Sequence, residues 1–237
     1  NNGAPLGVGS HPHRGIETVT IAYKGKVEHN DSTGAGGVIE EGGIQWMTSG
    51  KGILHKEYHE KNFSKKGGDM QMVQLWVNLP AKDKMTEPKY QNIENNDLAK
   101  VDLGNGIGSI DIIAGEFEKN KGPASSFTPL SLFNVKLNKG KGTSLSFNES
   151  HNTGLLIIKG NVTINNSEKA PTNHFVLFEN KGKEFTIKAE DEAEILVLSG
   201  EPIDEPIASY GPFVMNTNEE IRQTIDDFNS GKFGYLD

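Results

Sequence analysis

The chain has 237 residues, a formal net charge of −8 and no cysteine. The acidic balance provides no broad cationic field for nucleic acid or an anionic membrane, and no apolar run approaches the roughly 20 residues of a membrane-spanning helix. The lack of cysteine excludes disulfides, thiolate metal ligands and a cysteine nucleophile, so a metal site would use histidine and carboxylate ligands. A chain without cysteine also fits a reducing compartment, and we expect a cytoplasmic protein.

Short alternating segments dominate the first half of the chain. Val19, Ile21 and Tyr23 predict one face of a strand, and similar segments follow at 43–48 and 70–79. The 28 glycines and 10 prolines indicate many turns between these strands. This pattern is typical of a β-sandwich or β-barrel.

A second series of strands follows a polar connection at residues 82–96. Its predicted strands are 107–113, 130–137, 143–147, 155–158, 162–164, 174–178, 184–187 and 194–198. Two halves of like pattern predict an all-β chain with a duplicated architecture. We expect a first domain at 1–97, a second at 98–200 and a C-terminal extension at 201–237.

One helix is predicted near the C-terminus. Thr217 and Glu220 form a capping-box pattern, and Ile221, Ile225 and Phe228 recur at helical spacing before Gly231. An amphipathic helix must bury its apolar stripe, so we expect the extension to pack back on the barrels.

Two pairs of side chains have the spacing of metal ligands. On a strand, residues two apart point to the same side, so His11 and His13 form one pair, and His55 and Glu57 form another. Three imidazoles and one carboxylate suit a divalent first-row metal and leave positions open for a substrate. The pattern therefore predicts a catalytic rather than a structural metal site.

The same segments resemble the pirin family. In the first half the resemblance rests on HPHRGIETVT at 11–20, VEHNDS at 27–32, QWMTSG at 45–50, GILHKE at 52–57 and QLWVNLP at 74–80. Further downstream it rests on KMT at 84–86, SGEPI at 199–203, EP at 205–206 and YGPFVMNT at 210–217. It covers essentially the whole chain, and between 101 and 198 it depends on strand pattern alone.

The resemblance implies a bicupin, with two jelly-roll-type cupin barrels in tandem. The first barrel would hold one metal on His11, His13, His55 and Glu57, and the second would hold none. Iron(II) is implied by the family, while manganese, nickel, cobalt, copper and zinc also suit these donors. Members have several dozen residues of strand before the first histidine pair, whereas ten residues precede His11, so we expect the first barrel to lack its initial strands.

Function is also implied by the resemblance, because the family includes bacterial quercetin 2,3-dioxygenases and a nuclear, iron-containing transcriptional coregulator of eukaryotes. We expect a monomeric dioxygenase that cleaves a flavonol or similar enol with O₂, with Glu57 as metal ligand and proton acceptor. The alternative is a non-catalytic metal-binding regulator or redox sensor with a protein partner, and a weaker one is a cupin isomerase or inert storage barrel.

The remaining candidate residues are assigned by strand alternation and context. Met72, Gln74 and Trp76 are predicted to form the wall of the substrate pocket. Glu17 is expected to support the site rather than bind the metal, and His29 and Asp31 are expected to be solvated turn residues. His59 is expected at the surface, while His151 and His174 lack companions for a second metal site.

Overall fold

The computed structural model describes residues 6–237, which divide into two compact units. The first unit combines the residues up to Asp97 with Ile203–Asp237, and the second consists of Leu98–Pro202. The chain thus leaves the first unit, forms the second and returns to the first. The prediction of an all-β chain with a short C-terminal helix is confirmed.

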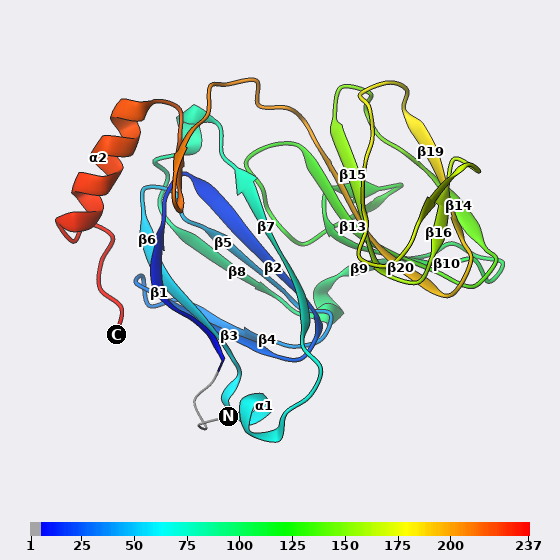
Figure 1. The fold of residues 1–237 in the computed structure, drawn as a ribbon, viewed down its shortest axis with the longest axis horizontal. Helices are drawn as coiled ribbons and strands as arrows, with labels where there is room; N and C mark the ends of the chain where they lie inside the picture. The colour runs from blue at the N-terminus through cyan, green and yellow to red at the C-terminus, as the bar shows by residue number, and fades with distance from the viewer. Residues whose placement is uncertain (1–5) are drawn as a thin grey trace. The chain divides into compact units, whose positions relative to one another are not determined.

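Two four-stranded antiparallel sheets build the first unit (Figure 1). Side chains of one sheet contact those of the other, so the two sheets face each other. In order, one sheet contains β1 (Gly7–His13), β6 (Ile53–His59), β3 (Val27–Asp31) and β4 (Gly36–Ile39). The other contains β7 (Gln71–Asn78), β2 (Ile16–Lys24), β5 (Ile44–Thr48) and β8 (Lys89–Ile93).

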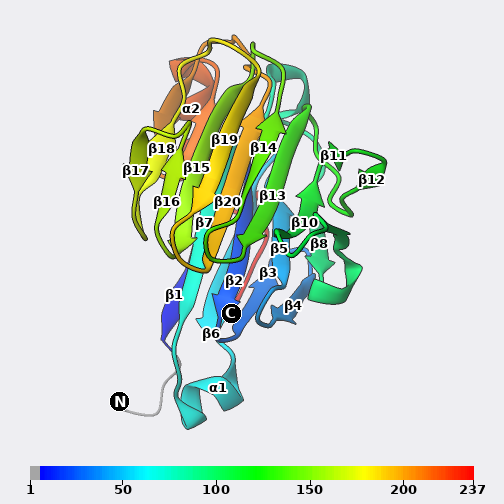
Figure 2. The same cartoon turned by 90° about the vertical axis from the view of Figure 1, so that its right-hand side faces the viewer.

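The second unit has a six-stranded and a four-stranded antiparallel sheet, and Figure 2 shows β15, β20 and β13 side by side. The larger sheet contains β18 (Phe175–Leu177), β15 (Asn152–Lys159), β20 (Ala193–Gly200), β13 (Leu130–Leu137), β10 (Gly108–Ala114) and β9 (Ala99–Asp102). The smaller contains β14 (Gly142–Ser146), β19 (Glu184–Ala189), β16 (Val162–Ile164) and β17 (Glu168–Ala170). A two-stranded ribbon of β11 (Glu116–Phe117) and β12 (Asn120–Lys121) completes it.

Helices are few and short among residues 6–237. One 3₁₀ turn is η1 (Ala81–Asp83), and a second is η2 (Asn95–Asp97). The lysine-rich stretch after His59 contains α1 (Lys61–Lys66). The Glu60 carboxylate caps this helix by accepting the backbone N–H groups of Asn62 and Phe63, both at 2.8 Å. Neither α1 nor α2 (Asn218–Asn229) has the length and apolar character required to span a bilayer.

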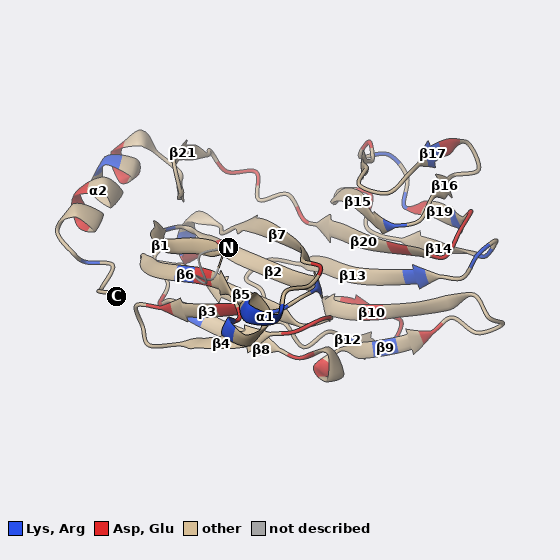
Figure 3. Ribbon diagram, turned by 60° about the horizontal axis from the view of Figure 1, so that its bottom comes forward, with Lys and Arg blue, Asp and Glu red and all other residues tan. Residues whose placement is uncertain are grey.

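The C-terminal segment packs on the first unit. After a small hairpin of β21 (Ala208–Tyr210) and β22 (Phe213–Met215), the predicted capping box of Thr217 and Glu220 starts α2. Ile221 is buried in one apolar cluster with Phe213, Met215 and Phe233, against which Leu54 packs. Most charged positions along α2 are acidic (Figure 3), and Arg222 is its one basic residue.

A buried ion pair ties α2 to the strand end that carries the first histidine pair. Arg14 is only 3% exposed, and its Nη1 lies 2.8 Å from Oδ2 of Asp227. Its Nε donates to the carbonyl of Lys51 at 2.7 Å, and the guanidinium lies 4.8 Å from the ring centroid of Phe233. Arg14 thereby joins three segments that are remote in sequence.

We predict that Asp227→Ala lowers the free energy of unfolding of the first unit by about 3 kcal/mol, because it leaves the Arg14 charge buried without its partner. Both tryptophans, Trp46 and Trp76, belong to this unit, so urea unfolding followed by tryptophan fluorescence reports on it specifically. Asp226→Ala changes the adjacent carboxylate of the same helix and should alter stability by less than about 0.5 kcal/mol.

Acid should remove this difference between wild type and Asp227→Ala. Hydrogen bonds from Lys232 and then from Arg14 hold the pKa of Asp227 far below its usual value. The stability that they contribute is therefore complete above a pH of about 4 and is lost as the pH falls towards the folded-state pKa. Equal stability of the two alanine variants at neutral pH would contradict the assigned role of the ion pair.

Candidate metal centre

Strand register places the predicted ligands on one inward face of the first unit. His11 of β1 lies opposite His55 of β6, and His55 lies opposite Asp31 of β3. Two residues further along β6, Glu57 lies opposite His29 of β3. Residues opposite each other on antiparallel strands share a face, so both predicted pairs project into the space between the sheets.

Three imidazoles converge in this space. The ring centroids of His11 and His55 are 4.2 Å apart, those of His13 and His55 4.9 Å, and those of His11 and His13 5.1 Å. One nitrogen from each ring lies within 4.8 Å of one nitrogen from each of the others. His13 is 2% exposed and His55 is fully buried, so protein surrounds most of the cluster.

Hydrogen bonds determine which nitrogens of two of these rings are free. His11 Nδ1 lies 2.8 Å from the carbonyl oxygen of Gly9, and His13 Nδ1 lies 3.3 Å from that of Pro212. A carbonyl only accepts, so both Nδ1 atoms carry the proton and both Nε2 atoms present a lone pair. The buried Nε2 atoms of His13 and His55 have no hydrogen-bond partner, and a divalent cation would satisfy them.

Electrostatics favours the neutral rings that metal binding requires. Burial, and then the neighbouring His11, lowers the pKa of His13 to about 4. Burial, and then His13, His11 and His29, lowers the pKa of His55 even further. Both rings are therefore neutral near pH 7, which is the state that binds a metal. On these grounds the residues fit the ion that the family resemblance implies.

Glu57 is held by polar side chains of the opposite sheet. Its Oε1 accepts hydrogen bonds from Gln45 Nε2 at 2.6 Å and from Thr20 Oγ1 at 3.1 Å. Its Oε2 accepts one from Gln74 Nε2 at 2.7 Å, which leaves lone-pair capacity on this oxygen. Glu57 forms a second potential ligand group with His29 and His55, within 4.8 Å, that shares His55 with the three-histidine group.

Alternate residues of β7 form the boundary of this space. Gln74 contacts Glu57 directly, and the Trp76 ring lies 5.3 Å from the His13 ring, edge to face. Trp76 is 50% exposed and Met72 45%, so this strand presents both apolar contact surface and solvent access beside the imidazoles. The role of the three residues as a substrate wall stays a prediction.

The assignment of His29 and Asp31 as solvated turn residues was wrong. His29 is 0% exposed and Asp31 3%, and both lie on the inward face of β3. Val27, His29 and Asp31 are buried and the residues between them are not, an alternation that the polar sequence 28–31 does not show. Glu17, which the sequence did not place among the ligands, is buried, accepts a hydrogen bond from Thr48 at 2.7 Å and has a pKa raised by burial.

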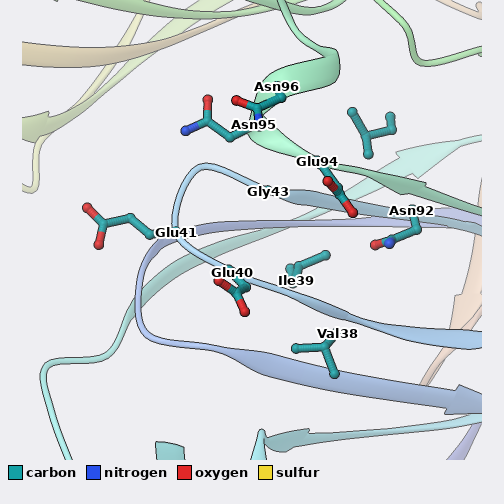
Figure 4. Close-up of a pocket in the computed structure, with 10 residues that line it drawn as sticks. Val38, Ile39, Glu40, Glu41, Gly43, Asn92, Glu94, Asn95 and Asn96 are labelled. Carbon is teal, nitrogen blue, oxygen red and sulfur yellow. The ribbon is translucent and has the colours of Figure 1, made fainter.

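A separate hollow of about 400 Å³ lies elsewhere in the first unit, between residues 38–43 and 92–96 (Figure 4). Glu40, Glu41 and Glu94 line it together with the amides of Asn92 and Asn95. It contains none of the converging imidazoles, so it is distinct from the candidate metal centre.

Comparisons with known proteins agree with this architecture. The pirin family model matches residues 2–77, and the model of the pirin C-terminal cupin domain matches residues 132–234. A Pseudomonas aeruginosa protein that is named, provisionally, a quercetin 2,3-dioxygenase is 46% identical over 96% of this chain and 79% of its own length. A pirin-like protein of Caulobacter vibrioides is 38% identical over 96% of this chain and 80% of its own length.

Solved structures show the same fold. The crystal structure of quercetin 2,3-dioxygenase from Acinetobacter baumannii is 47% identical, covers 99% of this chain and 81% of its own, and superposes with a TM-score of 0.95. A bacterial pirin from Escherichia coli in complex with nickel(II), 23% identical, covers 84% of this chain and 78% of its own, with a TM-score of 0.66. The strand pattern, both family matches and the identity to these relatives together establish that the chain belongs to the pirin family and carries two cupin domains.

Proposed function

We propose that this protein is a metal-dependent dioxygenase that opens the central ring of quercetin or a related flavonol with O₂. The observation that supports it most is the group of buried imidazoles whose unpartnered Nε2 atoms lie next to a carboxylate and a partly exposed strand. His11, His13 and His55 would hold the ion and Glu57 would complete the ligand set. The quercetin dioxygenase names of similar proteins support the choice of substrate.

A divalent transition metal bound there would supply Lewis acidity towards a chelating enol and redox chemistry towards O₂. Iron(II) is our proposed ion, on the resemblance to the family. The donor set also suits manganese, cobalt, nickel, copper and zinc, because imidazole and carboxylate ligands accept most divalent ions of this row.

Glu57 is the proposed proton acceptor for the substrate hydroxyl. Its Oε1 accepts hydrogen bonds from Gln45 and Thr20, whereas Oε2 accepts one, from Gln74. A flavonol hydroxyl approaching from β7 would therefore meet Oε2, and the proton would pass to it while Gln45 keeps the carboxylate in place. Deprotonation leaves the ring electron-rich and open to attack by O₂.

Trp76 and Met72 would bind the apolar body of the flavonol. A flat aromatic ligand buries area against an indole, and ring contacts contribute about 0.5–1.5 kcal/mol beyond that burial. Ring opening of quercetin by one O₂ adds one oxygen atom to each of two ring carbons, and both atoms remain in the ester product. The ring carbon between those two carbons leaves as carbon monoxide. Burial of the imidazoles keeps bulk water from most of the centre.

We predict that metal-free protein reloaded in turn with iron(II), manganese(II), cobalt(II), nickel(II) and copper(II) bleaches the quercetin absorption band under air with at least one ion. Carbon monoxide should be released, and the band should persist without oxygen. His55→Ala should abolish both metal retention and turnover, since it removes the fully buried ligand.

His174→Ala is the matched control for this assay, because it removes an exposed imidazole from the second unit. It should leave metal content and rate unchanged. Persistence of the quercetin band with every loaded metal would overturn the proposed activity, and a protein that retains metal without consuming oxygen would favour the regulatory alternative.

Trp76→Ala is predicted to raise KM for quercetin about tenfold with a small change in kcat, because about 1.4 kcal/mol of ring contact is lost in the ground and transition states alike. Trp76→Phe retains an aromatic face and should recover most of the affinity. Steady-state kinetics with a saturating metal separates the two constants, and an unchanged KM for Trp76→Ala would remove this residue from the pocket.

A further inference from the structure

His55 differs from the other two imidazoles in how its Nδ1 is held. His11 and His13 donate from Nδ1 to backbone carbonyls, which substitution cannot remove. His55 Nδ1 instead lies 3.4 Å from Nδ1 of His29. Among the three rings that converge, the orientation of His55 therefore depends on another side chain.

The surroundings of His29 fix its position. Its ring is 0% exposed and stacks on Tyr90, with centroids 4.7 Å apart and planes 9° from parallel. Its Nε2 lies 3.4 Å from Oδ2 of Asp31, and Gln45 Nε2 lies 3.1 Å from its Nδ1. Every polar atom of the ring thus faces a defined partner.

Asp31 is itself anchored through its other oxygen. Oδ1 accepts the backbone N–H and the hydroxyl of Thr33, at 2.8 and 2.6 Å, and the backbone N–H of Ala35 at 3.2 Å. Three donors on one oxygen hold the group as a carboxylate, so Oδ2 can only accept a hydrogen bond from His29.

The positions of the protons follow in sequence. Because Asp31 Oδ2 accepts, His29 carries its proton on Nε2 and presents a lone pair at Nδ1. That single lone pair is shared by two donors, the Gln45 amide at 3.1 Å, which also donates to Glu57, and the Nδ1–H of His55 at 3.4 Å. His55 is then left with a lone pair on Nε2, the buried atom that has no partner.

We infer that His29 is a positioning residue that holds His55 in the tautomer competent for metal binding, and that Asp31 imposes this state through His29. The inference rests on the metal centre of the proposed function and extends it beyond the four ligands, to two residues that touch neither the ion nor the substrate. Outer hydrogen bonds of this kind typically change metal affinity by about tenfold to a hundredfold.

His29→Phe tests the inference directly, because phenylalanine retains the stack on Tyr90 and removes the acceptor. We expect its affinity for cobalt(II), measured by chelator competition, to fall about tenfold to a hundredfold. His29→Asn places an amide oxygen near the former Nδ1 and should restore most of the affinity. Tyr90→Phe, which keeps the stack and loses only the 3.5 Å contact to Gln45, is the matched control and should bind as wild type.

Asp31→Asn is the sharper variant, because its oxygen can keep the turn while its amide nitrogen faces His29. That nitrogen donates, so it favours moving the His29 proton to Nδ1 and the His55 proton to Nε2, where it would block the metal. We expect cobalt(II) affinity to fall by about the same factor. Thr33→Val removes one of the three donors to Asp31 Oδ1 and leaves Oδ2 in place, so its cobalt(II) affinity should fall by less than that of Asp31→Asn.

Long-range proton–nitrogen NMR of the metal-free protein reads the tautomer without any activity. The His55 signals, assigned by their loss in His55→Ala, should report a proton on Nδ1 in wild type and His29→Asn, and on Nε2 in Asp31→Asn. A proton on Nε2 in wild type would overturn the inference, as would wild-type cobalt affinity in folded His29→Phe or Asp31→Asn. If His29→Phe does not fold, the NMR of wild type and Asp31→Asn still decides.

These outcomes are distinct from failure of the proposed activity. Protein that binds cobalt in a manner dependent on His29 and never attacks quercetin would retain the positioning role and lose the dioxygenase. If His29→Phe and Asp31→Asn both turn over quercetin with the rate and metal affinity of wild type, the dioxygenase activity stands and the positioning role is lost.

Discussion

The first unit is organised around a group of buried lone pairs that point at one another. His13 Nε2 and His55 Nε2 have no partner in the protein, and an unsatisfied buried polar atom costs about 1–3 kcal/mol. Burial, and then the like charge of the neighbouring rings, lowers the pKa of both His13 and His55, so both rings favour the neutral form. A cation would satisfy both lone pairs, so the fold that positions the rings creates a group that could hold a metal.

Both sheets of the first unit contribute side chains to this group. The sheet containing β1, β6 and β3 supplies the imidazoles and Glu57, while Thr20, Gln45 and Gln74 of the opposite sheet hold the carboxylate. The C-terminal segment contributes the carbonyl of Pro212 to His13 and the carboxylate of Asp227 to Arg14, the next residue along. Gly15 permits this approach, because it has φ of 79° and a Cβ there would lie 2.0 Å from the carbonyl oxygen of Val214.

Local pattern was sufficient to predict which candidate ligands share a face of one strand. The spacing of His11 with His13, and of His55 with Glu57, follows from two-residue alternation within a strand, and the Thr217 capping box is contained in four residues. The inward position of His29 was not evident, because residues 28–31 are all polar and the glycine-rich stretch that follows favoured a turn. What no local pattern could give is the register that sets His29 opposite Glu57 and Asp31 opposite His55.

Contacts between residues far apart in the sequence were even harder to predict from the sequence. Arg14 and Asp227 are 213 positions apart, and neither residue carries a local sign of its partner. Lys84 is 1% exposed although it follows a polar turn, because its Nζ donates to the carbonyls of Gly15 and Val214 and to the Asn78 side chain. Such contacts depend on the return of the chain to the first unit after the second is complete.

The interior of the second unit is mostly apolar, with Thr153 and Ser199 as buried polar residues on its inward strand faces. Its buried cluster contains isoleucine, leucine and valine side chains with Phe133 and Phe185, and Phe178 stacks on Phe185 at 4.4 Å. These side chains fill most of the space between the two sheets of the second unit, so its interior is an apolar core that stabilises by burial. The candidate metal centre therefore depends on the identity of a few inward residues on β1, β3 and β6 rather than on the fold alone.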